Sequence, residues 1–404
     1  MTTSTLFAPL TLASGEVIKN RFLKPAMSEV MGDKSHRPTQ QLINLYRHWA
    51  EGGTGLLITG NVMIDSNALG EVGNVVIEDE SNLGWLRTWA EAGQQNGAQI
   101  WVQLNHPGKQ SPRNVSQHPV APSAVPMAGA NSFAFNDPRE LTINEIHEIV
   151  RKFVRSAEIV KKAGFNGVEI HAAHGYLLNQ FLSPHDNRRS DEYGGNLTNR
   201  MRILVEIYEG MREAVGDDFS IGVKINSTDF SEDGFSEADS LTVIKQLSEL
   251  GVDLIEISGG NYENPEMIKT TGGAFFVNYA AKVKAQIATP IAVTGGFKTA
   301  AGMNAAVADG ATEMVGTARV LALVPDLPMQ IRSGQFQSID LDFLSTGIKS
   351  LDGKIGSMIG LSYYEMQMAR IATGKSVRRT TNAWIPLSFS LRKQGLSILI
   401  PQRN

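Results

Sequence analysis

The chain has 404 residues, of which 42% are hydrophobic and 19% charged, and its formal net charge is -4. This composition is typical of a globular protein with a large core, and it offers no basic field for nucleic acid. The absence of cysteine excludes disulfides, iron–sulfur clusters, thiolate zinc sites and cysteine nucleophiles. No signal-like segment opens the chain and no stretch approaches about 18 apolar residues, so we expect a cytoplasmic protein that binds neither membrane nor nucleic acid.

Residues 6–21 alternate in polarity around Ser14-Gly15, which predicts a short hairpin within an N-terminal cap, residues 1–21. From there on, short apolar strands alternate with amphipathic helices. The expected strands are Phe22–Met27, Gly55–Val62, Gln99–Leu104, Gly167–Ile170, Ser220–Ile225, Leu254–Ser258, Ile291–Thr294 and Glu313–Gly316. The expected helices are Pro38–Gly52, Leu83–Asn96, Ile143–Gly164, Asn199–Val215, Glu237–Leu250, Val277–Ile287, Ala300–Ala308 and Val320–Ser333.

Eight strand–helix units predict an α/β fold of the (β/α)8 type, a TIM barrel that forms one domain over residues 1–404. Thr142 and Glu145 fit a capping box at the start of the third helix. A doubly wound sheet is the weaker alternative, since no GxGxxG turn follows the first strand. The C-terminal extension, residues 335–404, has a helical pattern at Tyr363–Thr373 and ends in the apolar run LSILI. It either completes the fold or forms a subunit contact, which makes a homodimer a candidate assembly.

In such a barrel the functional residues lie where the strands end. The connection 105–141 follows the third strand and is far longer than the usual loop of roughly 2 to 6 residues, so we expect it to shape the site. The residues at the first five strand ends are Ser28, Thr59–Asn61, Gln103, Asn105, His106, His171, His174, Tyr176, Lys224 and Asn226.

The block after the fourth strand delivers His171, His174 and Tyr176 within six residues. Two imidazoles could bind a metal, with Glu169 and Asp186 near in sequence, or they could polarise a carbonyl. Tyr176 favours the second interpretation, because a phenol can deliver a proton to a carbanion. Core histidines and a packing tyrosine are the structural alternatives.

Gly295-Gly296 after the seventh strand and Arg319 after the eighth predict a phosphate site, because glycine backbone approaches an anion closely and Arg319 adds charge. A tight turn alone would also explain the glycines. Lys224 would form a Schiff base or place a fixed positive charge beside a cofactor. Gln103 favours the cofactor, since an amide suits the edge of a heterocycle.

These residues together resemble the old yellow enzyme family of FMN-dependent ene-reductases, within the NADH:flavin oxidoreductase group. The resemblance covers nearly the whole barrel, and its strand-four block is highly specific. The motifs that carry it are IKNRFLKPAMSE, WVQLNHPGKQ, VAPSAVP with PRELT, GFNGVEIHAAHGYLLNQFLSPHDNRRSDEYGGNLTNRMR, GVKIN, VTGGF and ARVLALVPDLP.

The resemblance implies a role for each matching position. Gln103 would contact the flavin pyrimidine ring, and Lys224 would lie near flavin N1 and O2, where it would stabilise the reduced anion. His171 and His174 would hold a substrate carbonyl oxygen, and Tyr176 would donate the proton. Asn105 and Phe276 would shape the substrate pocket. The full implied set of FMN contacts is Pro25, Ala26, Met27, Ser28, Gly60, Gln103, Lys224, Gly295, Gly296, Ala318 and Arg319, with no metal.

The implied reaction reduces the C=C bond of an enone or enal. NADH or NADPH passes a hydride to FMN, which passes it to Cβ while Tyr176 protonates Cα. Four positions depart from the family pattern. Ser28 replaces the common Thr or Cys near flavin O4, and Lys224 replaces Arg. Ala318 replaces Gly, which requires an ordinary φ there, and Asn105 stands where some members have Trp, which implies a more polar pocket. A cofactor-free lyase with a Schiff base on Lys224 and a barrel that binds a phosphorylated ligand without turnover are the rival functions.

Overall fold

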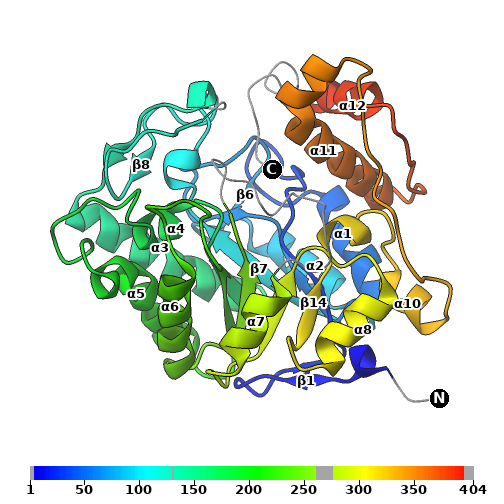
Figure 1. Ribbon diagram of the computed structural model, residues 1–404, viewed down its shortest axis with the longest axis horizontal. Helices are drawn as coiled ribbons and strands as arrows, with labels where there is room; N and C mark the ends of the chain where they lie inside the picture. The colour runs from blue at the N-terminus through cyan, green and yellow to red at the C-terminus, as the bar shows by residue number, and fades with distance from the viewer. Residues whose placement is uncertain (1–3, 130–131, 261–275, 395–404) are drawn as a thin grey trace.

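The computed structural model describes residues 4–129, 132–260 and 276–394. Within these residues, eight parallel strands close into a barrel in the order β10-β11-β12-β13-β14-β3-β4-β7, and β7 pairs with β10 to complete the ring. Helices surround the barrel, as Figure 1 shows. This arrangement confirms the predicted (β/α)8 fold.

The barrel strands are β3 (Phe22–Lys24), β4 (Leu56–Ile58), β7 (Gln99–Asn105), β10 (Gly167–Ala172), β11 (Ser220–Asn226), β12 (Leu254–Ser258), β13 (Ile291–Thr294) and β14 (Met314–Gly316). The helices of the barrel region are α1 (Gln40–Glu51), α2 (Leu83–Gly93), α3 (Ile143–Lys162), α4 (Leu177–Leu182), α5 (Leu197–Val215), α6 (Glu237–Glu249), α7 (Val277–Lys284), α8 (Ala300–Ala308), α9 (Ala318–Leu321) and α10 (Leu327–Arg332).

Several predicted boundaries were wrong for local reasons. The second strand was expected to run to Val62, but β4 ends at Ile58 and a separate strand, β5 (Val62–Met63), pairs with β6 (Val75–Val76) and β7. The first strand ends at Lys24, directly before Pro25, which has no N–H for the ladder. The last predicted helix is two helices, α9 and α10, with Pro325 in the break between them.

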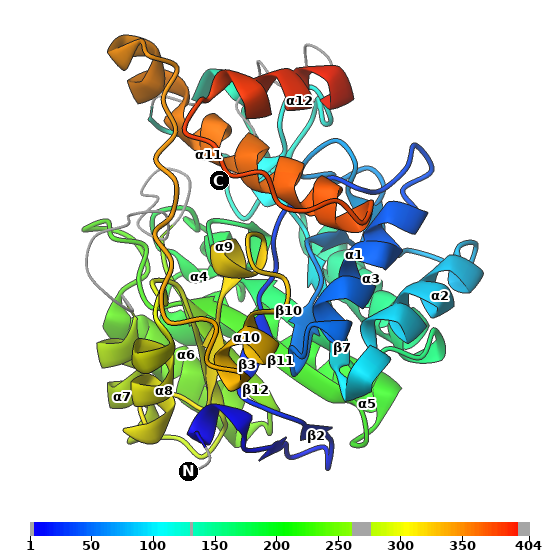
Figure 2. The ribbon, with the colours of Figure 1, turned by 90° about the vertical axis from the view of Figure 1, so that its right-hand side faces the viewer.

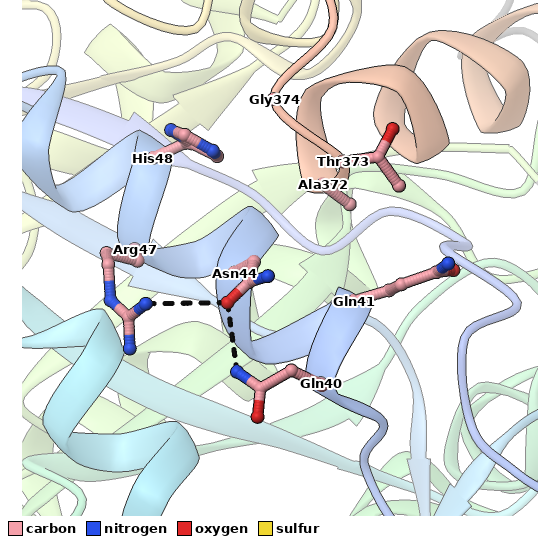
Figure 3. A pocket seen from close by; sticks show the side chains of 8 residues that line it. All are labelled: Gln40, Gln41, Asn44, Arg47, His48, Ala372, Thr373 and Gly374. Atoms are coloured by element: carbon pink, nitrogen blue, oxygen red, sulfur yellow. Dashed lines mark hydrogen bonds between the residues drawn. The ribbon is translucent and has the colours of Figure 1, made fainter.

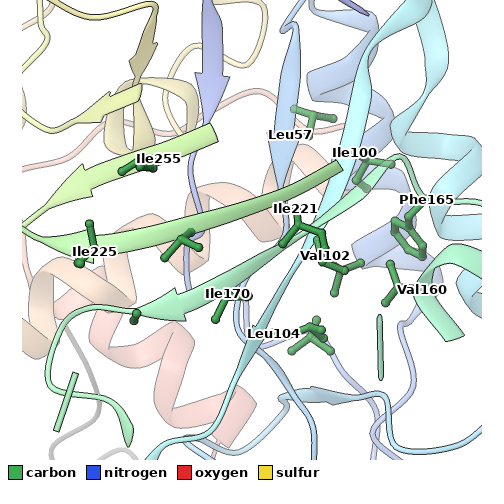
Figure 4. Close-up of a cluster of buried hydrophobic side chains, with 14 of the residues drawn as sticks. Leu57, Ile100, Val102, Leu104, Val160, Phe165, Ile170, Ile221, Ile225 and Ile255 are labelled. Atoms are coloured by element: carbon green, nitrogen blue, oxygen red, sulfur yellow. The ribbon is translucent and has the colours of Figure 1, made fainter. Parts of the chain in front are cut away.

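Strand parity divides the side chains between the barrel interior and the helical layer. Ile100, Val102 and Leu104 of β7 face outward and pack with Val160 of α3 and with Phe165, which follows that helix, as Figure 4 shows. Trp101 faces the interior together with the other inward residues of the lower barrel: Leu23, Leu56, Ile58, Leu254, Ala292 and Met314. The same alternation therefore places Gln103 and Asn105 inside the barrel, nearer the end where the strands finish.

The N-terminal hairpin closes the opposite end of the barrel. Strands β1 (Leu10–Thr11) and β2 (Val17–Ile18) pair antiparallel around Gly15, whose φ of 86° suits glycine. Leu10, Leu12 and Ile18 join the lower interior cluster, and the Ser14 N–H donates to Asp253 Oδ1 at 2.7 Å. The predicted capping box is also present, with Thr142 and Glu145 bonded reciprocally at the start of α3.

The long connection and the C-terminal extension lie at the other end of the barrel. The connection contains β8 (Val120–Ala121) and β9 (Arg139–Glu140), which pair with each other. The extension contains α11 (Lys349–Ala372) and α12 (Trp384–Gln394), which pack on each other, while α11 also packs on α1. Figures 1 and 2 both place these helices opposite the hairpin. The apolar run LSILI lies outside the described residues, and the single domain and the homodimer stay predictions.

Candidate active site

Four neighbouring strands carry polar side chains into the upper barrel. Gln103 of β7 lies beside Glu169 of β10, and Lys224 of β11 lies between His171 of β10 and Glu256 of β12 in the strand register. All five side chains are buried. Because these residues share the inward parity of Trp101, they form a polar layer directly above the apolar lower interior.

Hydrogen bonds and an ion pair connect this layer. Gln103 Nε2 donates to Glu169 Oε2 at 2.6 Å, and Lys224 Nζ lies 2.7 Å from Glu256 Oε1. Burial, reinforced by the charge of Glu256, raises the pKa of Glu169 well above its usual value. Burial would also raise the pKa of Glu256, but the Lys224 charge and a hydrogen bond from Glu169 hold it below its usual value. Glu169 therefore favours its protonated form and Glu256 is the counter-ion of Lys224, so the charges of these three side chains balance.

The predicted trio converges above this layer. The ring of His171 lies 5.2 Å from that of His174 and 4.7 Å from that of Tyr176, measured between centroids. His174 has a left-handed φ of 61°, a conformation that its surroundings must hold for a non-glycine residue. The His174 N–H donates to Asn226 Oδ1 at 3.1 Å, and its Nε2 lies 2.8 Å from Ser258 Oγ. The left-handed backbone and these two contacts together hold the His174 ring beside that of His171.

Three residues contact the trio in ways that sequence analysis did not predict. Asn226 and Ser258 hold His174, and Asn61 contacts Tyr176. Asn61 Nδ2 lies 3.4 Å from the Tyr176 oxygen and donates to it. The barrel rule did pick out Asn61 and Asn226 at predicted strand ends, but sequence analysis assigned no contact to either residue. Ser258 is the last residue of β12, and no motif distinguished it.

The end of the first strand meets a segment that sequence analysis did not single out. Ser28 Oγ donates to Glu71 Oε2 at 2.6 Å. Glu71 and Asn74 lie between β5 and β6, and Asn74 Nδ2 reaches Glu71 Oε1 and the Asn61 backbone oxygen, each at 3.3 Å. Gly60 is required beside them, because a Cβ there would collide with the Glu29 carboxylate.

The predicted phosphate residues follow the ends of two neighbouring strands, β13 and β14. Gly295 and Gly296 have φ of 118° and 84°, a backbone that L side chains rarely adopt. Ala318 opens the right-handed helix α9, so it has the ordinary φ that its replacement of glycine requires. Burial raises the pKa of Tyr364 in α11, and the charge of Arg319 opposes that rise, which puts Arg319 in electrostatic reach of the extension.

The substrate-pocket predictions have separate outcomes. Asn105 is buried at the end of β7, in the interior register. The buried ring of Phe276, at the start of α7, would collide with a Cβ at Gly259 and lies near Gly295. Its neighbour Phe275 lies outside the described residues. His106 turns away from this group: its Nδ1 accepts from the Gly108 N–H at 3.1 Å, and burial lowers the pKa of its imidazole to about 4.

The upper barrel fits a polar heterocycle with a phosphate. Among the described residues, Gln103 Oε1, Thr317 Oγ1 and both amide atoms of Asn105 are buried polar atoms with no hydrogen-bond partner in the protein. Buried polar atoms ordinarily find partners, so a ligand that supplies them explains all three residues. A planar ring above the Gln103–Lys224 layer, with its phosphate at Gly295, Gly296 and Arg319, matches this donor set.

Other features of the described ranges carry no comparable chemistry. No group of three or more His, Asp or Glu side chains there is arranged to hold a metal ion. A search of the same residues for a helix with the length and apolarity of a bilayer span finds none. A surface pocket of about 400 Å³ lies between α1 and the end of α11 (Figure 3), where Gln40 Nε2 donates to Asn44 Oδ1 at 2.9 Å. None of the predicted site residues line it.

Comparison with known proteins agrees with this geometry. A model of the NADH:flavin oxidoreductase / NADH oxidase family matches residues 5–337. The NADH-dependent flavin oxidoreductase iliE of Hypocrea jecorina (strain QM6a) is 37% identical over 355 residues, which cover 80% of this chain and 88% of that protein. Morphinone reductase in complex with tetrahydroNAD has a TM-score of 0.71 at 27% identity and covers 83% of this chain and 92% of that one. A 2-naphthoyl-CoA reductase complex has a TM-score of 0.78 at 28% identity and covers 82% of this chain but 52% of that one, so the chain spans about half its length.

Proposed function

The chain belongs to the NADH:flavin oxidoreductase / NADH oxidase family, the old yellow enzyme group, and is therefore an FMN-dependent NAD(P)H oxidoreductase; from this premise we propose that it reduces the C=C bond of α,β-unsaturated ketones and aldehydes. The observation that carries the proposal is the convergence of His171, His174 and Tyr176 above the buried layer in which Lys224 is paired with Glu256. Two hydrogen-bond donors and one proton donor are the groups that a conjugated carbonyl needs.

The histidine contacts define which ring nitrogens donate. His171 Nδ1 accepts from the Ala173 N–H at 3.3 Å, so the neutral ring carries its proton on Nε2. If the Ser258 hydroxyl donates to His174 Nε2, the His174 proton is on Nδ1. Each histidine then offers one N–H to the carbonyl oxygen. Such donors stabilise the enolate as charge develops, and one donor in a buried site is worth on the order of 3 kcal/mol.

Tyr176 supplies the proton for Cα. Because the Asn61 amide donates to the phenol oxygen, Tyr176 does not donate its own proton to Asn61. The same amide stabilises the negative charge left on the oxygen after proton transfer. When bound, FMN supplies the hydride for Cβ and takes its replacement from the nicotinamide nucleotide.

The residues that would hold FMN follow from the fit of the upper barrel. Gln103 Oε1 and the Lys224 ammonium would meet the polar edge of the ring, and the segment Pro25–Ser28 with Gly60 would flank it. Gly295, Gly296, Ala318 and Arg319 would bind the phosphate through backbone N–H groups and the guanidinium. Asn105 and Phe276 would border the substrate.

The lyase alternative lacks the feature that it requires. A Schiff-base lysine attacks as a neutral amine with access to the substrate, whereas Lys224 Nζ is held in a buried ion pair with Glu256. The unpaired Oε1 of Gln103 and the unpaired amide of Asn105 also have no task in aldol chemistry.

Anaerobic spectroscopy tests the proposed function. Purified protein should be yellow, should bleach on addition of NADH or NADPH, and should regain its visible absorbance when cyclohexenone is added. Parallel titrations with the two nucleotides give the preference between them. If the bleached protein is reoxidised by oxygen but by no enone or enal, the proposed substrate class is wrong.

A further inference from the structure

A buried carboxylate that the proposed reaction does not use is connected to the trio by hydrogen bonds. Asp229 lies in the loop after β11 and is 2% exposed. Its Oδ1 accepts from two side-chain amides, Asn226 Nδ2 at 2.9 Å and Asn179 Nδ2 at 3.2 Å. Its Oδ2 accepts from the Phe235 N–H at 3.1 Å, so both carboxylate oxygens have donors and the side chain is fixed.

The two amides turn their oxygens toward the backbone of the turn after β10. Asn226 Oδ1 accepts from the His174 N–H at 3.1 Å, and Asn179 Oδ1 accepts from the Gly175 N–H at 2.6 Å. A side-chain amide donates only through its nitrogen and accepts only through its oxygen. The acceptor that Asp229 provides for both nitrogens therefore sets the direction in which both oxygens point.

The turn that these amides hold has an unusual backbone. His174 and Gly175 have left-handed φ angles of 61° and 75°, and this region is unfavourable for His174 because it has a Cβ. Such a conformation persists only where its surroundings fix it. Without the two acceptors the turn can relax toward an ordinary φ, which would move the His174 ring from its place 5.2 Å from that of His171.

We propose that Asp229 is a positioning residue for the reaction: through Asn226 and Asn179 it holds the left-handed turn that presents the His174 imidazole to the substrate oxygen. This inference rests on the function proposed above. Asp229 supplies no group to the reaction itself, because its effect is carried by the hydrogen bonds of two other side chains. Its loss should therefore weaken the hold on an oxyanion and leave the flavin bound.

The variant Asp229→Ala tests this proposal in the FMN-loaded protein. The probe is p-hydroxybenzaldehyde, a phenol whose oxyanion resembles the enolate, and its binding is read from the change in flavin absorbance. The dissociation constant should rise about tenfold, which is the effect of roughly one lost hydrogen bond, because each amide loses the acceptor that the two share. The FMN content per chain should equal that of the wild type. Asn226→Ala removes the acceptor of the His174 N–H directly and should have the same effect.

A double-mutant cycle separates positioning of His174 from a general loosening of the site. In a His174→Ala background, Asp229→Ala should change the phenol dissociation constant by less than about twofold, because the imidazole that carries its effect is gone. If Asp229→Ala does not fold, Asn226→Ala takes its place in the cycle.

Asn20→Ala is the matched control. Asn20 is a buried asparagine that also joins backbone groups, but at the hairpin end of the barrel: its Oδ1 accepts from the Phe22 N–H at 3.1 Å, and its Nδ2 donates to the Gly53 oxygen at 2.8 Å. Its loss should lower the midpoint of urea unfolding and leave phenol affinity unchanged.

The proposal is overturned if Asp229→Ala and Asn226→Ala bind the phenol as tightly as the wild type. It is equally overturned if Asp229→Ala weakens binding by the same factor with and without His174, or if Asn20→Ala weakens it as much. Failure of the proposed function is distinguishable, because a wild type that is never reoxidised by an enone still gives a phenol dissociation constant with which the variants are compared. A wild type that does not bind the phenol at all overturns both proposals.

Discussion

Replacement of Glu169 by glutamine should change how the stability of the protein depends on pH. The introduced amide has the shape of a protonated glutamic acid, so it can accept from Gln103 and donate to Glu256 as the wild-type side chain does. The substitution therefore removes the titration of this carboxyl while it keeps the hydrogen bonds of the layer.

The sign of the expected change in stability follows from the direction of the pKa shift of Glu169, and its upper limit follows from the pH range. Burial and the Glu256 charge raise the folded-state pKa of Glu169 well above the ordinary 4.5. The stabilisation that its proton provides is complete below pH 4.5 and is lost as the pH rises toward the folded-state pKa. Each pH unit in that window costs the wild type about 1.4 kcal/mol. Between pH 5.5 and 7.0, Glu169→Gln should therefore gain stability relative to the wild type, with an upper limit of about 2 kcal/mol over these 1.5 pH units.

Urea unfolding of both proteins at pH 5.5 and 7.0, with FMN held at one saturating concentration, measures this difference. Glu145→Gln is a control of opposite sign, since hydrogen bonds from Arg139 and Thr142 lower the pKa of Glu145 to about 2. Its stabilising effect is present above pH 4.5 and is lost as the pH falls, so the slope between 5.5 and 7.0 should not change. Parallel pH profiles for the wild type and Glu169→Gln would show that Glu169 is ionised in the folded protein and would refute the charge assignment of the layer.

Tyr176→Phe should slow enone reduction by about 10²–10⁴-fold in stopped-flow reoxidation while the nucleotide bleaches the flavin at the wild-type rate; equal loss in both half-reactions would contradict its role as proton donor. Gly60→Ala should lower the free energy of unfolding by about 1–3 kcal/mol, because the added Cβ would collide with the Glu29 carboxylate and the Met27 backbone oxygen. A midpoint of urea unfolding equal to that of the wild type would contradict this prediction and show that these neighbours can move apart without cost. Lys109→Met should cost about 3–5 kcal/mol, since the buried Asp186 lies 2.6 Å from Lys109 Nζ and would lose this ion pair; a loss below about 1 kcal/mol in the same assay would contradict a stabilising role for the pair.

Much of the fold is a consequence of local sequence patterns. The strand Ser220–Ile225 was predicted within one residue of β11, and Ala300–Ala308 matches α8 at both ends. Such elements can be predicted because the spacing of apolar residues and the capping residues are local properties of the sequence. The N-terminal half of α11 was missed, because Gly353, Gly356 and Gly360 have poor helix propensity and only packing in the folded chain supports a helix there.

The sequence by itself determined the barrel, the family and the identity of the trio His171, His174 and Tyr176, because strand order and short motifs are written along the chain. Only the tertiary structure decided which polar side chains lie next to one another. Gln103 and Glu169 are 66 residues apart, and Ser28 and Glu71 are 43 apart, yet each pair forms a hydrogen bond. The physical reason is that burial and neighbouring charge set the proton of a carboxyl, and both depend on the closed barrel that brings distant strands into register.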